Sequence, residues 1–315
     1  MIWLYAVQFA APLISIAWML LLPARSRLGF TLQCLGSAAA LGVMALRGIW
    51  LLPPWWAPWL FAAMLGIAAW LSWHRIRPFV SALPANRSAW VVLAVYLALG
   101  TTSAYGTVNS LRSRSTPVTG VVNLEFPLEA GRYLVVNGGS DISTNAHLET
   151  LDAGVPGYRA WRGQSYGVDL VALNGFGLRA RGVQPTDPRA YRIYDARVLA
   201  PCAGKVVIAV DGLPDMQVPD VDRDHLAGNH VMLRCAEADV LLGHLQPSSV
   251  RVSAGAGVAE GAWLGLVGNS GNTGEPHLHI HAQDQGSAES PLSGDPRPIQ
   301  FNDHFPVRGD RIKAP

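Results

Sequence analysis

The first third of this sequence lacks acidic residues altogether. Residues 1–106 contain no Asp, no Glu and no Lys, yet they hold nine of the eleven tryptophans. Their charged side chains are six arginines, at positions 25, 27, 47, 75, 77 and 87. The remainder carries all 22 acidic residues, so the formal net charge of +2 describes neither part of the chain. We therefore draw no inference of nucleic-acid binding from the charge.

Long uncharged apolar runs fill the part that lacks acids. Ile2–Leu22 and Phe30–Trp50 are each of about bilayer-spanning length, the second interrupted only by Arg47 near its end. Ala57–Trp73 and Ala89–Tyr105 are shorter but still plausible spans. The sequence predicts an α-helical transmembrane region of about four helices over residues 1–106. No basic residue precedes the first run and further runs follow it, which argues against a cleaved signal peptide.

Loop charges give this region an orientation. Arg25 and Arg27 follow the first run and three arginines follow the third, whereas the intervening loop LLPPWWAPW is uncharged and aromatic. Short basic loops stay in the cytoplasm. An even number of spans then places both termini outside. We expect a multi-pass protein of a bacterial-type inner membrane, in contact with lipid, whose chain after about Tyr105 faces the periplasm or the exterior.

Cysteine is scarce, and its three positions fit this topology. Cys34 lies inside the second apolar run, where it is interpreted as a small packing residue. Cys202 and Cys235 lie in the exported part, in segments with β-strand composition. An oxidising compartment lets such thiols pair, so the sequence predicts a Cys202–Cys235 disulfide. Closing a loop of that length stabilises a domain by roughly 3–4 kcal/mol on the chain-entropy model.

The exported part has a composition typical of short strands. Runs such as KVVIAV, HVMLRC, DVLLGHL and HLHIHA alternate with Gly, Pro, Asn and Asp, and no helical period separates them. The sequence predicts an all-β domain over residues 129–290, an antiparallel β sandwich or open barrel. Residues 107–128 form a polar linker in this interpretation, and residues 291–315 form a C-terminal tail.

The segment GEPHLHIHAQ places three histidines at alternate positions. His277, His279 and His281 are separated by Leu278 and Ile280. Side chains alternate between the two faces of a strand, so the three imidazoles line one face. Two histidines at this spacing can share a metal ion. The alternative is a solvent-facing polar strand without a chemical role.

The order of several motifs resembles a known family. APCAGKVV, GNHVML, LLGHL and GAWLGLVGNSGNTGEPHLHIH follow one another as in the zinc metallopeptidases of the lysostaphin (LytM-type) family, which cut peptide bridges in peptidoglycan. The resemblance covers roughly residues 160–285. A Gly-rich loop that leads into HLH, after an isolated His-Leu, is more specific than any of its parts. The resemblance implies an antiparallel β fold of the duplicated hybrid motif type and a Zn²⁺ cofactor.

The resemblance also implies roles for individual residues. His279 matches a zinc ligand of the family, and Asp169 in QSYGVDLV matches its carboxylate ligand. His277 and His244 match two histidines that assist catalysis beside the metal. His281 stands where the family usually has Glu. We assign it no role and expect it to be an exposed strand residue.

One zinc ligand of the family is missing. The family has a His four residues before the Asp, where this chain has Ser165, a poor zinc ligand. A variant pattern of the family pairs an NxH segment with a later QxYxxD segment, and this chain resembles it, with His147 in the NAH segment. His147 is therefore the expected third ligand. His225 and His230 remain rival donors.

These assignments lead to two functional hypotheses. The first is a membrane-anchored zinc metallo-endopeptidase that acts on peptidoglycan cross-links or another exported peptide. Two imidazoles and one carboxylate suit a catalytic zinc site, and two further histidines suit proton transfer near neutral pH. The second is a catalytically silent envelope scaffold that binds a partner with the same groove. The sequence predicts neither the bond cleaved nor an oligomeric state.

Overall fold

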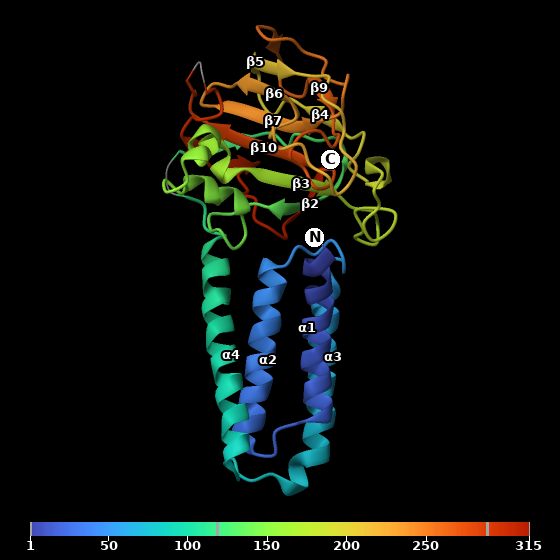
Figure 1. Ribbon diagram of the computed structural model, residues 1–315, viewed down its shortest axis with the longest axis vertical. Coiled ribbons are helices and arrows are strands. Elements are labelled where there is room, and N and C mark those ends of the chain that lie inside the picture. Colours follow the sequence, from blue (N-terminus) through green and yellow to red (C-terminus); the bar gives the residue numbers. More distant parts are fainter. Residues whose placement is uncertain (1, 118–119, 288–289, 315) are drawn as a thin grey trace. The chain divides into compact units, whose positions relative to one another are not determined.

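The protein consists of two compact units, residues 1–111 and 112–315, which are described separately (Figure 1). The computed structural model describes residues 2–117, 120–287 and 290–314. The first unit contains four helices and a short 3₁₀ turn. Their bounds are α1 (Ile2–Leu21), α2 (Arg27–Arg47), α3 (Ala57–Ile76), η1 (Arg77–Phe79) and α4 (Arg87–Arg112). The four predicted helices are thus present, each 20 residues long or more.

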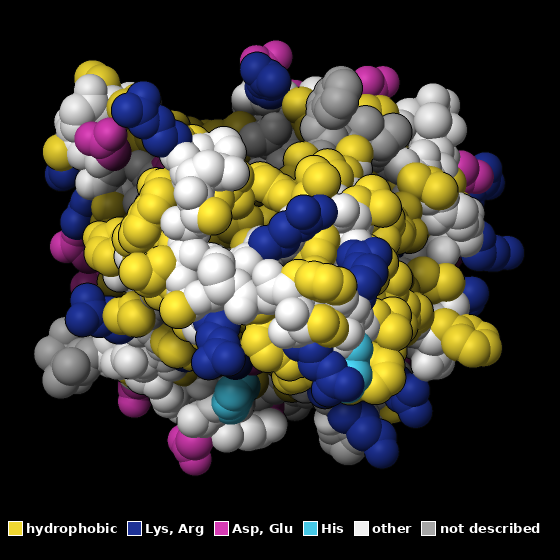
Figure 2. Space-filling view, turned by 90° about the horizontal axis from the view of Figure 1, so that it is seen from below, with side chains coloured by type: hydrophobic (Ala, Val, Ile, Leu, Met, Phe, Trp, Pro, Cys, Tyr) yellow, Lys and Arg dark blue, Asp and Glu magenta, His cyan; other side chains and the backbone are white. Residues whose placement is uncertain are grey.

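The helical unit has an apolar core, but it also exposes many large apolar side chains and buries a few polar ones. Leu35 on α2 and Ile67 on α3 are among the exposed large apolar residues, at 59% and 58%. Inside the unit, Gln33 is 1% exposed and donates to Leu22 O and Tyr96 Oη. Figure 2 shows apolar side chains gathered over this unit with arginines set among them. This arrangement is typical of helices whose surroundings are apolar.

Two of the described helices, α2 and α4, are long and apolar enough to cross a membrane. The prediction of about four spans is therefore too high by this measure, although all four helices form. In α1 the apolar segment Tyr5–Leu21 is shorter than a candidate membrane span. α3 contains three tryptophans and ends in His74 and Arg75, side chains of lower hydropathy.

The two arginine-rich loops lie side by side at one end of the helical unit. Ser26, after α1, forms an isolated parallel bridge with Ser81, after α3. Arg27 N donates to Ser81 O at 2.8 Å, and Ser81 N donates to Arg25 O at 3.3 Å. Ser26 also caps α2 by accepting from Gly29 N. The loops in which the sequence concentrates its basic residues therefore share one end of the unit.

The second unit is built from short strands and 3₁₀ turns. The strands are β1 (Val122–Leu124), β2 (Gly131–Asn137), β3 (Val168–Ala172), β4 (Arg197–Leu199), β5 (Gly204–Val210), β6 (Asn229–Arg234), β7 (Asp239–Leu245), β8 (Gly257–Val258), β9 (Trp263–Leu266), β10 (Leu278–Gln283), β11 (Pro296–Arg297), β12 (Ile299–Phe301) and β13 (Arg311–Ala314). The 3₁₀ turns are η2 (Ala146–Leu151), η3 (Pro156–Tyr166) and η4 (Pro188–Ala190).

The main sheet of this unit is antiparallel. Its order is β13-β2-β3-β10-β7-β6-β5-β8, with β11 paired to β10. Two small sheets, β1-β12 and β4-β9, accompany it, and β1 and β12 run parallel. The predicted antiparallel all-β domain is confirmed. In the central strands β7 and β10 every residue is buried, because both faces of the sheet are covered.

The core lies on one face of the main sheet. Leu170, Val231, Leu242, Leu278 and Ile280 belong to a single apolar cluster, and each is fully buried. Their alternate neighbours on the central strands point to the opposite face, as the two-residue period of a strand requires. The polar side chains of β3 and β10 thereby gather on that opposite face.

The segment that the sequence assigns to a tail is part of the fold. Within residues 291–315, β11 pairs with β10, β12 with β1, and β13 with β2. Ile299 and Phe301 lie in the apolar core, which explains why the segment is held to the sheets. β1 likewise lies inside the predicted linker, residues 107–128.

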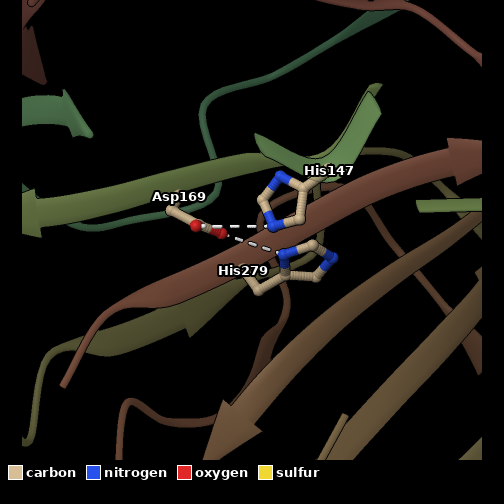
Figure 3. Close-up of side chains that lie close together, drawn as sticks. All are labelled: His147, Asp169 and His279. Atoms are coloured by element: carbon tan, nitrogen blue, oxygen red, sulfur yellow. Dashed lines mark hydrogen bonds and ion pairs between the residues drawn. The ribbon is translucent and has the colours of Figure 1, made fainter. Parts of the chain in front are cut away.

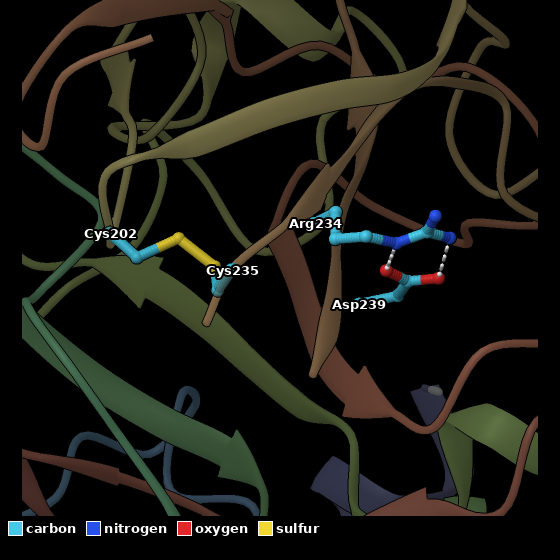
Figure 4. The surroundings of a disulfide bond; sticks show 4 residues. All are labelled: Cys202, Arg234, Cys235 and Asp239. Atoms are coloured by element: carbon cyan, nitrogen blue, oxygen red, sulfur yellow. Dashed lines mark hydrogen bonds and ion pairs between the residues drawn. A yellow bond between two sulfur atoms is a disulfide. The ribbon is translucent and has the colours of Figure 1, made fainter. Parts of the chain in front are cut away.

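The predicted disulfide between Cys202 and Cys235 is present (Figure 4). It closes a separation of 33 residues at the end of β6. Beside it, Arg234 Nε and Nη2 donate to the two carboxylate oxygens of Asp239 at 2.8 and 3.0 Å. Cys34 in α2 is a free thiol, as its position in the apolar run implied.

Candidate metal centre

Asp169 on β3 and His279 on β10 lie opposite each other on neighbouring strands. Their Cα atoms are register partners, and His279 is also paired with Gly243 on β7. Because Leu278 and Ile280 enter the core, His279 points to the other face of the sheet, together with Asp169. The strand pairing itself therefore brings a carboxylate and an imidazole together.

His147 reaches this pair from η2. Asn145 caps η2, and its Oδ1 accepts from His147 N at 3.2 Å. His147 Nδ1 lies 3.0 Å from Asn145 Oδ1 and 3.2 Å from Gly167 O. The Asn145 amide nitrogen in turn donates to Gly139 O and Gly167 O. Both oxygens near His147 are acceptors, so its Nδ1 carries the proton and its Nε2 keeps a lone pair.

Three side chains converge on one point (Figure 3). His147 Nε2 lies 3.5 Å from Asp169 Oδ2, and His279 Nδ1 lies 2.9 Å from Asp169 Oδ1. One ligand atom from each residue falls within 4.8 Å of the others. Gly167 makes the approach possible, since a Cβ there would lie 2.7 Å from His279 Cε1. Two imidazoles and a carboxylate form a donor set that fits zinc.

Ser165 occupies the place of the family's missing ligand but takes part in a different contact. It is fully buried, and its Oγ lies 2.6 Å from Arg162 O and 2.8 Å from Thr150 Oγ1. Thr150 belongs to η2 and also donates to His147 O at 2.8 Å. The serine thus joins η3 to the turn that carries His147.

Two residues that the sequence did not single out hold Asp169 in place. Asn137 Nδ2, on β2, donates to Asp169 Oδ2 at 2.8 Å. Arg308 Nη2 donates to Asn137 Oδ1 at 2.7 Å, and its other nitrogens donate to Val136 O and Ser143 O. Burial lowers the pKa of Arg308 to about 10, while the charge of Asp169 acts in the opposite direction. The predicted tail therefore supplies part of the support of the site.

His244 and His277 line the same site. Their ring centroids are 4.7 Å apart, and His244 lies 5.9 Å from His279. His244 Nδ1 donates to Ser270 O at 2.9 Å and His277 Nδ1 donates to Glu275 O at 2.9 Å, which leaves a lone pair on each Nε2. His244 adopts a positive φ of 61°, a conformation that costs about 1–3 kcal/mol and clusters at functional sites.

A buried ion pair fixes the loop before β10. Arg179 Nε and Nη2 donate to the two carboxylate oxygens of Glu275 at 2.7 and 2.8 Å, and the side chains are 2% and 5% exposed. The Arg179 guanidinium also lies 5.6 Å from the Tyr191 ring centroid. Because Glu275 O accepts from His277, this pair holds the carbonyl that orients the His277 ring.

Burial controls the charge of the site. It lowers the pKa of His147 to about 4 and that of His244 well below its ordinary value. For Asp169, burial alone would raise the pKa, but the charges of His147 and His277 and the hydrogen bond from His279 hold it well below its ordinary value. At neutral pH His147 and His244 are therefore neutral and Asp169 is ionised, and a neutral imidazole and an ionised carboxylate are the forms that bind metals.

His281 departs from its prediction. It is not an exposed strand residue, because only 3% of it is accessible and its Nδ1 lies 2.9 Å from His279 Nε2. η3 and the segment around Leu292 cover this face of β10, so that Trp161 and Gln164 line a small cavity with His279 and His281. Burial lowers the pKa of His281 well below its ordinary value, the charge of His279 lowers it further, and a side-chain interaction with Gln283 opposes them.

The rival histidines lie elsewhere. His225 is exposed and its ring nitrogen lies 2.8 Å from Asp222 Oδ2. His230 Nδ1 donates to Gly228 O at 2.8 Å, so that residue stays within its own strand and turn. Within the described residues, the cluster of possible metal ligands consists of His147, Asp169 and His279 and includes neither rival. The structure thus brings together the five predicted site residues.

Comparison with known proteins identifies part of the chain. Residues 191–291 match the family described as Peptidase family M23. No curated protein matches the chain. Among solved structures, a mutant catalytic domain of the prophage-encoded M23 protein EnpA from Enterococcus faecalis shares 21% identity, over 38% of this chain and 68% of that chain, with a TM-score of 0.25.

Two further solved structures are similar over a larger part of this chain. Lysostaphin from Staphylococcus simulans shares 18% identity, over 53% of this chain and 46% of that chain, with a TM-score of 0.25. Csd3 from Helicobacter pylori shares 16%, over 64% of this chain and 38% of that chain, with a TM-score of 0.30. This chain therefore spans less than half the length of these two proteins. Residues 191–291 of this chain, which include His244, His277 and His279, are a peptidase family M23 domain.

Proposed function

We propose that this protein is a membrane-anchored zinc metallo-endopeptidase that acts on peptide cross-links of peptidoglycan or on another exported peptide. The observation that carries the proposal is the convergence of His147, Asp169 and His279 beside two further histidines. Three of these five residues lie within the peptidase family M23 segment. The substrate class follows from the resemblance to lysostaphin-type peptidases.

In this proposal His147, Asp169 and His279 hold zinc. Three protein ligands are the usual number for catalytic zinc, and the ion supplies a Lewis acid that activates water and polarises the scissile carbonyl. The protein contributes a carboxylate that Asn137 holds in position and, in His147, an imidazole that burial keeps neutral. The set replaces the family's missing histidine with one from η2.

His244 and His277 carry the proton transfers. A backbone carbonyl holds the Nδ1 proton of each ring, so each Nε2 offers a lone pair toward the site. Such a nitrogen can accept a proton from the attacking water and later donate it to the amine that leaves. Each ring is fixed by its carbonyl partner, so little reorganisation is needed when the substrate binds.

The test uses the full chain, purified in detergent, with zinc content and cleavage of peptidoglycan as readouts. The parent should hold about one zinc per chain, and His147→Ala should lose both zinc and cleavage because two protein ligands hold the ion poorly. The matched control is His304→Ala, an exposed histidine outside the site. Zinc binding by His147→Ala at the parent's affinity would contradict the assignment.

Ser165 supports the second candidate, a scaffold without catalytic activity. The family's first ligand is absent, and the serine is engaged with Thr150 and Arg162. In that case the parent would hold no zinc and cleave no peptidoglycan, while the folded domain would still bind a peptide or protein in the same groove. Zinc content of the parent separates the two candidates directly.

The proposed anchoring has its own test. The two basic loops share one end of the helical unit, which supports a cytoplasmic position for both. A topology reporter fused at residue 25 or 80 should be read in the cytoplasm, and one at residue 54 or at the C-terminus should be read outside. A cytoplasmic C-terminal reporter would overturn both the orientation and the peptidoglycan substrate.

A further inference from the structure

We propose that His281 and Gln283 form a hydrogen-bond relay that keeps the proton of His279 on Nε2 and leaves the lone pair of Nδ1 for the metal. The relay rests on the proposed zinc site. It consists of neighbouring side chains on one face of β10, since positions 279, 281 and 283 alternate with the core residues. His281 is thus a positioning residue rather than a surface residue of this strand.

The far end of the relay is fixed by backbone carbonyls. The Gln283 amide nitrogen donates to Pro291 O at 2.7 Å and to Asp284 O at 3.2 Å. Carbonyl oxygens only accept, so the nitrogen must face them and Oε1 must face the other way. Gln283 is fully buried, and its Oε1 has no hydrogen-bond partner among the residues that the structure describes.

His281 lies between that oxygen and the metal ligand. Its Nε2 is the second buried polar atom of this strand that lacks a hydrogen-bond partner within the described part of the chain, and its Nδ1 lies 2.9 Å from His279 Nε2. Placing the proton of His281 on Nε2 makes these two unpartnered atoms complementary, a donor on His281 and an acceptor on Gln283. It also leaves a lone pair on Nδ1, which accepts the Nε2 proton of His279.

This arrangement determines the form of His279. A neutral imidazole whose proton is on Nε2 keeps its lone pair on Nδ1, the nitrogen that faces Asp169. Nδ1 lies 2.9 Å from Asp169 Oδ1, so in the other form, with the proton on Nδ1, it donates to the carboxylate. Moving from one form to the other shifts a proton between ring nitrogens in both histidines, and no proton leaves the pair. The relay thereby leaves Nδ1 free to bind a metal without changing the net charge of the two histidines.

The experiment measures zinc affinity of the full chain in detergent, by competition with a chromophoric chelator, and the thermal midpoint without zinc. His281→Leu removes the acceptor and should weaken zinc binding about 10–100-fold, the usual effect of losing the partner of a metal-bound histidine. His281→Glu restores an acceptor and should bind within about threefold of the parent. The control, His230→Leu, removes another histidine, one that is partly buried, and should leave zinc affinity unchanged.

A merely structural role gives a different pattern. If His281 had only a structural role, the Leu and Glu variants would bind zinc with the same affinity, or zinc affinity would fall together with the thermal midpoint in every variant, His230→Leu included. Either result overturns the relay. Gln283→Met provides a second measurement should His281→Leu fail to fold. It should weaken zinc binding in the parent but not in His281→Glu, because a carboxylate needs no acceptor; equal losses in both backgrounds also overturn the relay. A parent without zinc would overturn the proposed function instead, and the relay with it.

Discussion

Both units of this protein bury an apolar core, but most of the exposed large apolar side chains belong to the helical unit. In the β unit the apolar residues of β3, β7 and β10 form the core, and polar groups on the opposite face are satisfied by partners or gathered at the site. In the helical unit Gln8, Gln33 and Ser72 are buried while large apolar side chains are exposed. The proposed membrane surroundings account for the apolar surface of the helical unit, whereas the β unit keeps most of its large apolar side chains inside.

The distribution of charge follows the same division. The helical unit has no acidic residue, and its arginines collect in loops at one end or, like Arg47, bond to the neighbouring helix. The β unit contains all the acidic residues, two of which it buries against arginines, Glu275 with Arg179 and Asp239 with Arg234. The acidic residues and the candidate site therefore belong to the β unit, and the proposed anchoring belongs to the helices.

The largest effect should come from His244, because the proposed function assigns proton transfer to this histidine and His277, both in the β unit. His244→Ala should lower peptidoglycan cleavage about 10²–10⁴-fold, the usual contribution of general acid–base catalysis. Zinc content should stay near that of the parent, since His244 lies outside the ligand cluster. His225→Ala, an exposed histidine, is the control. Loss of zinc in His244→Ala would show that ligand and catalytic roles have been confused.

A smaller but still large effect is expected at the buried ion pair. Arg179→Met leaves Glu275 buried without its bidentate partner and should lower the stability of the β unit by about 3–5 kcal/mol. Urea-dependent pulse proteolysis of this unit measures the change. The double variant Arg179→Met/Glu275→Leu should lose less than the single one, because no unpaired charge remains. A double variant that is less stable than the single would refute this account.

The disulfide should contribute about 3 kcal/mol to the β unit and nothing to the helices. Cys202→Ser/Cys235→Ser removes a cross-link over 33 residues, which on the chain-entropy model frees the unfolded chain. The same proteolysis assay reports the loss. Cys34→Ser is the matched control, since that thiol is free and lies in α2. An equal response of both variants would contradict the assignment.

Much of this division could be predicted from the sequence, because it depends on local pattern. Uncharged runs predict helices, and the alternation around His279 predicts its strand and its face. The exposure of His281 could not be predicted in the same way. Alternation gives the face of a strand, but what covers that face is η3, a segment more than 110 residues earlier in the chain. The same limit hid Arg308, whose partner Asn137 is 171 residues away.

The candidate site likewise contains residues that local sequence motifs predict and one that non-local contacts place. Asp169 and His279 follow from strand motifs, whereas His147 required a resemblance to a variant pattern because its turn is placed by Asn145 and Thr150 through non-local contacts. The structure supplies those contacts. That the three residues bind zinc remains a prediction.

Two equally exposed apolar residues test the difference in surroundings. Leu35 in α2 and Val183 in the β unit are 59% and 57% exposed. Leu35→Asp should raise the apparent free energy of membrane insertion by about 2.5–3.5 kcal/mol, measured by the share of chains whose reporter at residue 54 is read outside. Val183→Asp should change stability by less than about 0.5 kcal/mol. If Leu35→Asp left the free energy of insertion unchanged, α2 would lie in water, and the proposed difference in surroundings between the two units would be wrong.

The smallest effect, counted for one histidine and one pH unit, should again be confined to the β unit. Burial lowers the pKa of His147 to about 4 and also lowers those of His230 and His244. Between the ordinary histidine pKa of about 6.5 and these lower values the unfolded chain binds more protons than the folded chain, so stability falls as pH falls.

Each such histidine contributes a slope of about 1.4 kcal/mol per pH unit in that window, and the stabilisation is fully present above about pH 6.5. Pulse proteolysis of the chelator-treated protein between pH 7 and 4.5 should therefore show the β unit losing stability. His244→Leu should reduce the slope, because it replaces a buried base with a side chain that cannot bind a proton. His304→Ala is the control, since that histidine is exposed. A slope that His244→Leu leaves unchanged would mean that acid acts elsewhere, and the buried neutral imidazoles would no longer explain how the site is kept ready for a metal.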